Sequence, residues 1–288
     1  MKTVTILGSE NILGYGVLET LLKTNSNNYK LRLLKDLSRN HKIINSVANR
    51  IDDSDIINFT PWSGSSLSSI CTIDSESNPD YVINCLDEYS EDTLKMSYIN
   101  SYFPQLLSSW TTRCNVKLIH FSSIKSLDLE KGFEYTETHE IYSNQDYGQS
   151  KKLGEPQSGA MVLRLNTPIG VCPKNEEGLV TYLKSLSETE ELKISPRHIL
   201  NSITNLEAGR ICKTIIDKNL YEESLVHVYS PMVVSLFQLS RLLSDKYKLN
   251  LNIKPDNKGE IKKEILSSKN DLNEKLQIPP LPEQIKNL

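Results

Sequence analysis

A tyrosine and a lysine stand four positions apart, at Tyr147 and Lys151, in the segment YGQSKKLGE near the middle of the 288-residue chain. On a helix, side chains with this spacing lie on one face, with their Cβ atoms about 5–6 Å apart. An ammonium group that close to a phenol favours the phenolate and brings the phenol toward useful acidity. The pair could therefore handle a proton together. Taken alone, the pattern is equally typical of an exposed helical turn.

A second pattern with chemical meaning is the segment LGSENILGYG near the N-terminus. A short β-branched run ends at Gly8, and helical spacing begins around Gly14. A dinucleotide-binding fold needs a tight turn here, so that backbone N–H groups and the start of a helix meet a pyrophosphate. Asn11 stands where the middle glycine is usual, and asparagine tolerates a positive φ better than other non-glycine residues. An ordinary strand-to-helix turn has the same pattern.

The end of the second expected strand bears on the choice of cofactor. An acidic residue there would bind ribose hydroxyls, whereas a basic residue would accept the 2′-phosphate of NADP. We place Lys35 at this position, with Asp36 beside it and Arg39 close behind. This favours NADPH, and a shift of one residue in register would favour NADH.

The elements that must position these residues alternate between strands and helices. Apolar, β-branched runs predict strands at residues 4–8, 30–36, 55–62, 79–87, 116–123 and 160–167. Helical spacing predicts helices at residues 14–23, at residues 92–112 with a kink at Pro104, and around Tyr147. Most of the strands are apolar on both faces, which predicts an α/β fold with a Rossmann-like, doubly wound parallel sheet.

The second half of the chain is less regular. We expect helices at residues 177–188, 205–218 and 235–247, a strand at residues 225–230, and an irregular surface lobe from Lys254 onward. This divides the chain into a dinucleotide-binding domain, residues 1–170, and a mixed C-terminal part, residues 171–288. That part would hold a smaller substrate lobe and a segment that returns to the first domain.

Composition narrows the classes of partner. The net charge of −3 is spread over mixed signs, so no basic stripe indicates nucleic acid or a membrane surface. No apolar run approaches the roughly 20 residues of a membrane span, and the N-terminus lacks the features of a signal peptide. The five cysteines are scattered, which favours reduced thiols and a cytoplasmic location. The histidines are equally dispersed, so we predict no metal site.

Five motifs follow one another along the chain: the glycine turn, VINC, HFSS, YGQSKKLGE and VLRLNTPIG. In this order they resemble the extended short-chain dehydrogenase/reductases, and within them the dTDP-4-dehydrorhamnose reductase family. The particular likeness is YTETHEIYSNQDYGQSKKLGE, where family members carry Tyr-x-Glu-Thr before the Tyr-Gly-x-x-Lys helix. The resemblance covers roughly residues 1–250, and the order of the motifs is more specific than any one of them.

The resemblance implies a catalytic set of Ser123, Tyr147 and Lys151. Tyr147 would protonate the carbonyl oxygen of a substrate, Lys151 would lower the pKa of Tyr147 and bind the nicotinamide ribose, and Ser123 would hydrogen-bond the same oxygen. Reduction of a ketone creates an alkoxide, so hydrogen-bond donors are needed where its charge develops. The cofactor would supply the hydride. Taken alone, Ser123 reads as an ordinary strand-end serine.

The resemblance also implies contacts for cofactor and substrate. The expected cofactor contacts are Gly8, Asn11, Ile12, Leu13, Gly14, Lys35, Arg39, Cys85, Tyr147 and Lys151. The expected substrate contacts are Glu88, Ser122, Arg197 and His198. An arginine fork suits a diphosphate, although the Arg197–His198 pair could equally be an exposed loop. Arg164 is an alternative residue for holding the active-site loops.

Two departures from the family pattern stand out. NCLDEYSED replaces a small, alanine-rich stretch, so Asp87 and Glu88 would place carboxylates near a polyanionic cofactor unless they point away or a substrate group needs them. Pro156 and Gly159 should stop the tyrosine helix soon after Glu155, which weakens a dimer built on that helix and leaves at most a weak homodimer.

The favoured function is NAD(P)H-dependent reduction of the 4-keto group of a nucleotide-diphospho-4-keto-6-deoxyhexose, in deoxysugar and polysaccharide biosynthesis. A non-catalytic, dinucleotide-binding regulatory subunit of the same fold is an alternative, because Asn11 and the Asp87–Glu88 pair could weaken the cofactor site. A sugar-nucleotide epimerase is a third.

Overall fold

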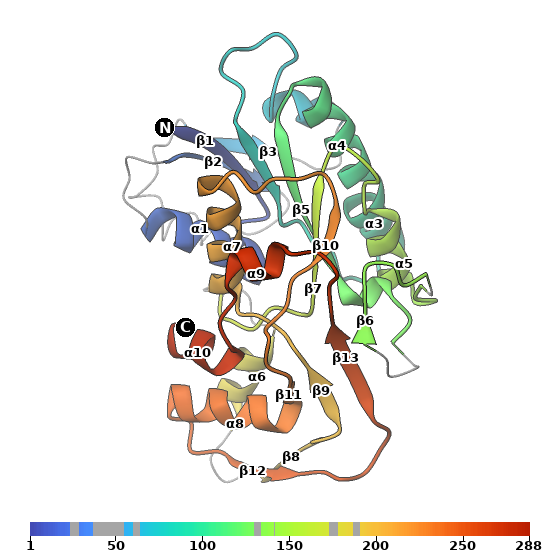
Figure 1. Ribbon diagram of the computed structural model, residues 1–288, viewed down its shortest axis with the longest axis vertical. Helices are drawn as coiled ribbons and strands as arrows, with labels where there is room; N and C mark the ends of the chain where they lie inside the picture. Colours follow the sequence, from blue (N-terminus) through green and yellow to red (C-terminus); the bar gives the residue numbers. More distant parts are fainter. Residues whose placement is uncertain are drawn as a thin grey trace.

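A seven-stranded parallel sheet occupies one half of the molecule (Figure 1). The computed structural model describes residues 1–23, 29–36, 55–59, 64–129, 134–140, 142–172, 178–186 and 191–288. Within these residues, the strands of the main sheet are β1 (Lys2–Leu7), β2 (Tyr29–Asp36), β3 (Ile56–Phe59), β4 (Tyr81–Asn84), β5 (Lys117–Ser123), β7 (Met161–Leu165) and β10 (Leu225–His227). Their order is β3-β2-β1-β4-β5-β7-β10. After β3 the chain crosses back, and β4 pairs with the other side of β1, so the strand order reverses between β1 and β4.

Helices cover both faces of this sheet. One face carries α1 (Ile12–Lys23) and α7 (Asn205–Asp217), and the other carries α3 (Thr93–Ser97), α4 (Phe103–Arg113) and α5 (Asp146–Leu153) (Figure 1). Apolar residues of α1 and α7 pack into one core with β1, β2 and β5, whereas those of α4 pack into a second core with β4 and β5. All four residues of β4 are buried, as expected for a strand covered on both sides. The predicted Rossmann-like α/β class is confirmed.

The long helix predicted at residues 92–112 contains a π-helical turn. Residues Tyr98–Tyr102 form this turn between α3 and α4. Pro104 is the second residue of α4, directly after this turn, and it has no N–H to donate to the turn before it. The widened turn brings buried Asn100 toward α5, which positions part of the site described below.

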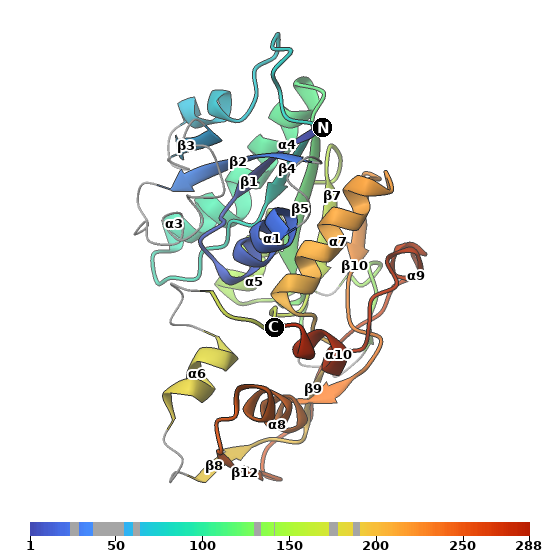
Figure 2. The same ribbon diagram turned by 90° about the vertical axis from the view of Figure 1, so that its left-hand side faces the viewer.

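The second half of the molecule is a smaller mixed part that lies beyond one end of the main sheet (Figure 2). Its helices are α6 (Leu179–Ser185), α8 (Leu236–Tyr247) and α10 (Leu281–Lys286). One small sheet has the order β11-β9-β13-β6, and a second pairs β12 with β8. These strands are β6 (Glu134–Tyr135), β8 (Glu191–Ile194), β9 (His198–Leu200), β11 (Val234–Ser235), β12 (Asn252–Pro255) and β13 (Lys262–Leu266).

The prediction of an irregular lobe after Lys254 is wrong. This stretch contains β13, α9 (Leu272–Leu276) and α10, and it is tied into both halves of the molecule. Leu276 and Ile278 pack into the core under α1 and α7, and Leu281 and Ile285 pack with α8. The lysines and asparagines of this stretch dominate its composition, so the few apolar residues that pack into the two cores did not stand out in the sequence. No helix among the described residues has the length and apolar content to cross a bilayer.

Candidate active site

The turn between β1 and α1 requires glycine at two positions. Gly8 has a φ of 77°, and a Cβ there would lie 2.9 Å from the backbone of Cys85 and Leu86. A Cβ on Gly14 would lie 2.0 Å from the carbonyl oxygen of Gly8. The turn therefore packs against the end of β4 with no room for side chains, in the manner of a dinucleotide-binding turn.

Asn11 contributes to this turn through its side chain. Its tolerance of a positive φ is not needed here. Asn11 is absent from the positive-φ residues found in the described part of the chain. Its Oδ1 accepts a hydrogen bond from the N–H of Gly14 at 2.8 Å, and its Nδ2 donates to the carbonyl oxygen of Cys85. Asn11 thus ties the start of α1 to the end of β4.

The start of α1 fits the pyrophosphate of a dinucleotide. The first N–H groups of a helix have no intrahelical partner, and they favour an anion. Of these, the N–H of Gly14 is taken by Asn11, whereas no hydrogen bond is found for those of Ile12 and Leu13 in the part of the chain that the structure describes. Cys85 faces the turn with its backbone, and burial raises the pKa of its thiol.

The residues predicted to select between NADPH and NADH are only partly placed. Lys35 lies in β2, one residue before the strand ends at Asp36, and its backbone pairs with Asn58 of β3. Arg39 lies outside the described residues. The preference for NADPH stays a prediction.

Tyr147 and Lys151 meet at a third residue, Asp87, in the loop after β4. The phenol of Tyr147 lies 3.1 Å from each carboxylate oxygen of Asp87, and Nζ of Lys151 lies 3.3 Å from Oδ1. Both side chains therefore share one face of α5, as their spacing predicts. Lys151 also donates to the carbonyl oxygen of Phe121 in β5 at 3.4 Å, which holds the ammonium between the sheet and the loop.

Ser123 lies at the end of β5 and reaches the same phenol. Its hydrogen bond with Tyr147 lowers the pKa of the phenol, and its Oγ also accepts from the backbone N–H of Lys125 at 3.2 Å. The ring of Tyr89 stands edge-on to that of Tyr147, with centroids 5.0 Å apart. The three residues expected to catalyse are thus in one place.

The prediction that Lys151 lowers the pKa of Tyr147 is wrong for the protein on its own. Burial and the charge and hydrogen bonds of Asp87 hold the pKa of Tyr147 well above its ordinary value of 10, and the opposing effect of Ser123 is smaller. After burial, the main cause is the carboxylate of Asp87, whose negative charge disfavours a phenolate beside it and is itself paired with Lys151. At neutral pH, Tyr147 is therefore a protonated phenol, ready to donate.

Asn100, which the sequence did not single out, fixes the loop that carries Asp87. Its side chain accepts from the N–H of Glu88 at 2.9 Å and donates to the Glu88 carbonyl oxygen at 2.7 Å. It also donates to Oγ of Ser150 in α5 at 3.1 Å. Gly154 lets α5 approach, because a Cβ there would lie 1.7 Å from the carbonyl oxygen of Asn100.

The two carboxylates of the loop point in different directions. Asp87 faces Tyr147 and Lys151, whereas the carboxylate of Glu88 pairs with Lys95 of α3 at 3.1 Å. The carboxylate of Glu88 is thus engaged with a lysine and turned away from Tyr147, and its assignment to substrate binding stays a prediction.

Ser122, also expected to bind substrate, belongs to a buried polar network instead. Its Oγ donates to Oε1 of Glu155 at 2.7 Å. Arg164 of β7 donates to the same carboxylate twice, from Nε at 2.8 Å and from Nη2 at 2.7 Å, and its Nη1 lies 2.9 Å from Nε2 of His227. Because side chains alternate along a strand, Ser122 faces this network while Ser123 faces Tyr147. The network braces the end of α5 against β5, β7 and β10.

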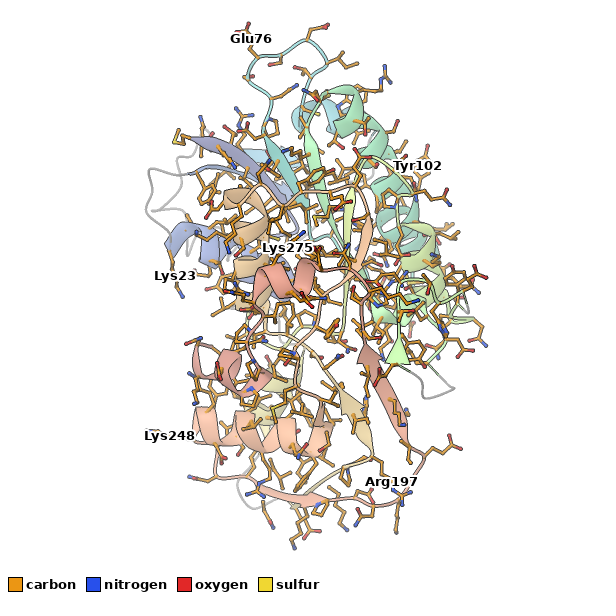
Figure 3. The ribbon with its side chains drawn as sticks, viewed as in Figure 1. Lys23, Glu76, Tyr102, Arg197, Lys248 and Lys275 are labelled. Atoms are coloured by element: carbon orange, nitrogen blue, oxygen red, sulfur yellow. The ribbon has the colours of Figure 1, made fainter. Side chains whose placement is uncertain are left out.

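Arg197 and His198 have different surroundings. Arg197 donates to the carbonyl oxygen of Gly259 at 3.0 Å, and Figure 3 shows it at the end of the smaller part that lies away from α5. Arg197 thus lies away from Tyr147, and its assignment to the substrate stays a prediction. His198 lies 3.2 Å from Glu264, whose carboxylate also pairs with Lys125 at 2.6 Å, two residues after Ser123. His198 is thus linked to the edge of the site through Glu264.

A Rossmann-type sheet with a glycine turn, a strand-end serine and a Tyr-x-x-x-Lys helix defines the class of short-chain dehydrogenase/reductases. The chain belongs to the family described as RmlD substrate binding domain, whose sequence profile matches residues 1–261. No curated protein matches the chain.

Solved structures share the fold over nearly the whole length. A dTDP-4-dehydrorhamnose reductase of Clostridium acetobutylicum is 16% identical, with a TM-score of 0.72, over 99% of this chain and 97% of the other. The reductase of Bacillus anthracis, in complex with NADP, is 17% identical, with a TM-score of 0.72, over 100% and 98%. A UDP-glucose 4-epimerase of Thermotoga maritima is 20% identical, with a TM-score of 0.72, over 99% and 96%.

Proposed function

We propose that the chain reduces the 4-keto group of a nucleotide-diphospho-4-keto-6-deoxyhexose with NAD(P)H, as a step in deoxysugar and polysaccharide biosynthesis. The observation that carries the proposal is the meeting of Ser123, at the end of β5, with Tyr147 and Lys151 of α5, at the loop that follows β4 beside the glycine turn. The family and the reductases named above support it, as does the complex of one of them with NADP. We expect NADPH to be preferred and NADH to be accepted.

Each residue has a defined part in this reaction. A bound nicotinamide would supply a hydride to the carbonyl carbon. Tyr147 donates its phenolic proton to the carbonyl oxygen, and Ser123 donates a hydrogen bond to that oxygen as negative charge develops there. The ammonium of Lys151 then stabilises the phenolate that remains. Ile12 and Leu13, at the start of α1, would hold the pyrophosphate.

The test combines cofactor binding with turnover. Purified protein is titrated with NADPH and NADH by nicotinamide fluorescence, and turnover of dTDP-4-dehydrorhamnose is followed by loss of cofactor absorbance. Tyr147→Phe should bind the cofactor normally but lose roughly 10²-fold or more in kcat, the usual contribution of a general acid. Tyr142→Phe, at an exposed tyrosine in the preceding segment, is the matched control and should be unaffected. Equal turnover of the two variants would contradict the proposed acid.

A non-catalytic, dinucleotide-binding regulatory subunit is a second candidate. Two observations favour it: the pairing of Lys151 with Asp87, and the capture of the Gly14 N–H by Asn11. Cofactor binding without turnover of any nucleotide-linked 4-keto sugar would support this candidate. A sugar-nucleotide epimerase is a third, and it would interconvert two sugars without net consumption of the cofactor.

We propose a cytoplasmic location and at most a weak homodimer. The five cysteines are all buried and unpaired, which suits a reducing compartment. Leu94, Tyr102 and Leu153 are exposed on α3, the π turn and α5 (Figure 3 labels Tyr102), and these offer a small apolar surface for association. Sedimentation over a range of concentrations would measure it, and a monomer at every concentration would exclude it.

A further inference from the structure

Asp87 stands between the reacting side chains of α5 and the solvent. Its carboxylate contacts the phenol of Tyr147 through both oxygens and the ammonium of Lys151 through one. The Asp87 side chain is 43% exposed, whereas that of Lys151 is 4% exposed. A carboxylate in this position can exchange protons with water on one side and with the phenol on the other.

We propose that Asp87 keeps Tyr147 in its proton-donating form and returns a proton from solvent to it after each turnover. This inference rests on the proposed reductase function. Asp87 would act through Tyr147 and without touching the substrate, so it is a positioning and proton-supplying residue.

The proton transfers balance as follows. Tyr147 gives its phenolic proton to the carbonyl oxygen as the carbonyl carbon receives hydride, and a phenolate remains. The carboxylate of Asp87 takes up one proton (H⁺) from solvent and passes it to the phenolate oxygen, to which it lies within hydrogen-bonding distance. The phenol is restored and Asp87 is again a carboxylate. One proton from solvent is consumed for each ketone reduced.

The same geometry favours reduction over the opposite reaction. A tyrosine that starts alcohol oxidation, as an epimerase requires, must be a phenolate in order to accept the hydroxyl proton. A carboxylate at hydrogen-bonding distance opposes that form, because the two negative charges repel. Asp87 therefore favours Tyr147 of this chain as the acid of a reduction over Tyr147 as the base that an epimerase needs for its oxidation step.

The charged and polar groups that face the phenol can be named. Lys151 approaches from α5, Ser123 from the end of β5, and Tyr89 from the loop that carries Asp87. Glu88, the next residue along, is turned toward Lys95. Glu88 is thus a neighbouring carboxylate of the same loop that does not touch Tyr147, which makes it a matched control.

The first test follows the phenol directly in cofactor-free protein. Tyrosine labelled with ¹³C at Cζ reports ionisation by NMR, and Tyr147→Phe identifies the signal of Tyr147. In Asp87→Asn, Tyr147 should titrate at lower pH than in the unsubstituted protein, whereas Glu88→Gln should leave the titration unchanged. An unchanged titration in Asp87→Asn would overturn the proposal, whether or not the protein reduces a substrate.

The second test separates the first turnover from later ones. With NADPH and dTDP-4-dehydrorhamnose, Asp87→Asn should give a burst of one cofactor oxidised per site, followed by a steady rate roughly 10-fold or more below that of the unsubstituted protein. An unaltered steady rate without a burst would overturn the proton-supplying role. If the unsubstituted protein oxidises no cofactor while the NMR titration still shifts in Asp87→Asn, the proposed reductase function fails and the control of Tyr147 by Asp87 stands.

Discussion

Removing the guanidinium of Arg164 should destabilise the protein strongly, because it leaves a buried carboxylate without its main partner. Arg164 is 1% exposed and makes two charge-assisted hydrogen bonds to Glu155, at 2.8 Å and 2.7 Å. In Arg164→Met, a side chain of similar length fills the space while the charge is lost. Glu155 keeps the bonds from Ser122 at 2.7 Å and from Lys152 at 3.1 Å, and a long one from Ser126 at 3.5 Å.

The expected loss is about 3–5 kcal/mol in the free energy of unfolding, the cost of breaking a buried ion pair from one side. Because Glu155 keeps its bond to the partly exposed Lys152, we expect a loss toward the lower end of this range. In Arg164→Met/Glu155→Leu, no buried charge is left behind, so the double variant should lose less than the single variant.

The pH dependence adds a check on the cause. Burial opposes ionisation of Glu155, but the hydrogen bonds and charge of Arg164 outweigh it and lower the pKa of the carboxyl below 4.5. In the single variant, burial prevails and the pKa of Glu155 rises. Protonation then relieves the unpaired charge, so the stability gap to the unsubstituted protein should narrow as the pH falls from 7 toward 5.

Urea denaturation at both pH values, followed by circular dichroism, measures these differences. If the free energy of unfolding of Arg164→Met lies within about 1 kcal/mol of that of the unsubstituted protein, the reasoning is refuted, because an exposed ion pair contributes no more than that. A double variant less stable than the single one would refute it equally, since the loss would then come from packing.

Three further changes have definite outcomes. Gly14→Ala places a methyl group against the glycine turn and should abolish NADPH binding in a fluorescence titration; normal binding would contradict the close packing described there. Gly154→Ala forces a methyl group to 1.7 Å from the carbonyl oxygen of Asn100, and urea denaturation should show a loss of about 1–3 kcal/mol. Burial and the charge of Arg164 lower the pKa of His227 from 6.5 to about 4, so the unfolded chain binds a proton there first as the pH falls. Stability should therefore drop by about 2 kcal/mol between pH 7 and pH 5, and His227→Gln should lack this part of the loss.

The sequence predicted the elements whose signals are local. The glycine turn, the apolar strands and the Tyr147–Lys151 spacing each lie within a few residues, and backbone geometry alone brings their members together. The fold class follows from the alternation of strands and helices, whereas the place of Ser123 beside Tyr147 was expected from the family resemblance and not from a local pattern.

The remaining features depend on contacts that no local pattern specifies. Asp87 reaches Tyr147 across 60 positions of sequence, and Asn100 reaches Ser150 across 50. The sequence predicted a carboxylate near the expected cofactor site but could not show that it faces the phenol of Tyr147. Ser122 was assigned to the wrong side because alternation along β5 decides which of two adjacent serines faces the site.

The last part of the chain ties the core under α1 and α7 to the core of the smaller part. Ile278 is anchored in the core under α1 and α7, and Leu281, three positions later, is anchored in the core of the smaller part. Three residues of fully extended chain span only about 10–11 Å. This short tether limits how far the smaller part can swing from the sheet without pulling one anchor loose, so any opening for a substrate must pivot close to these residues.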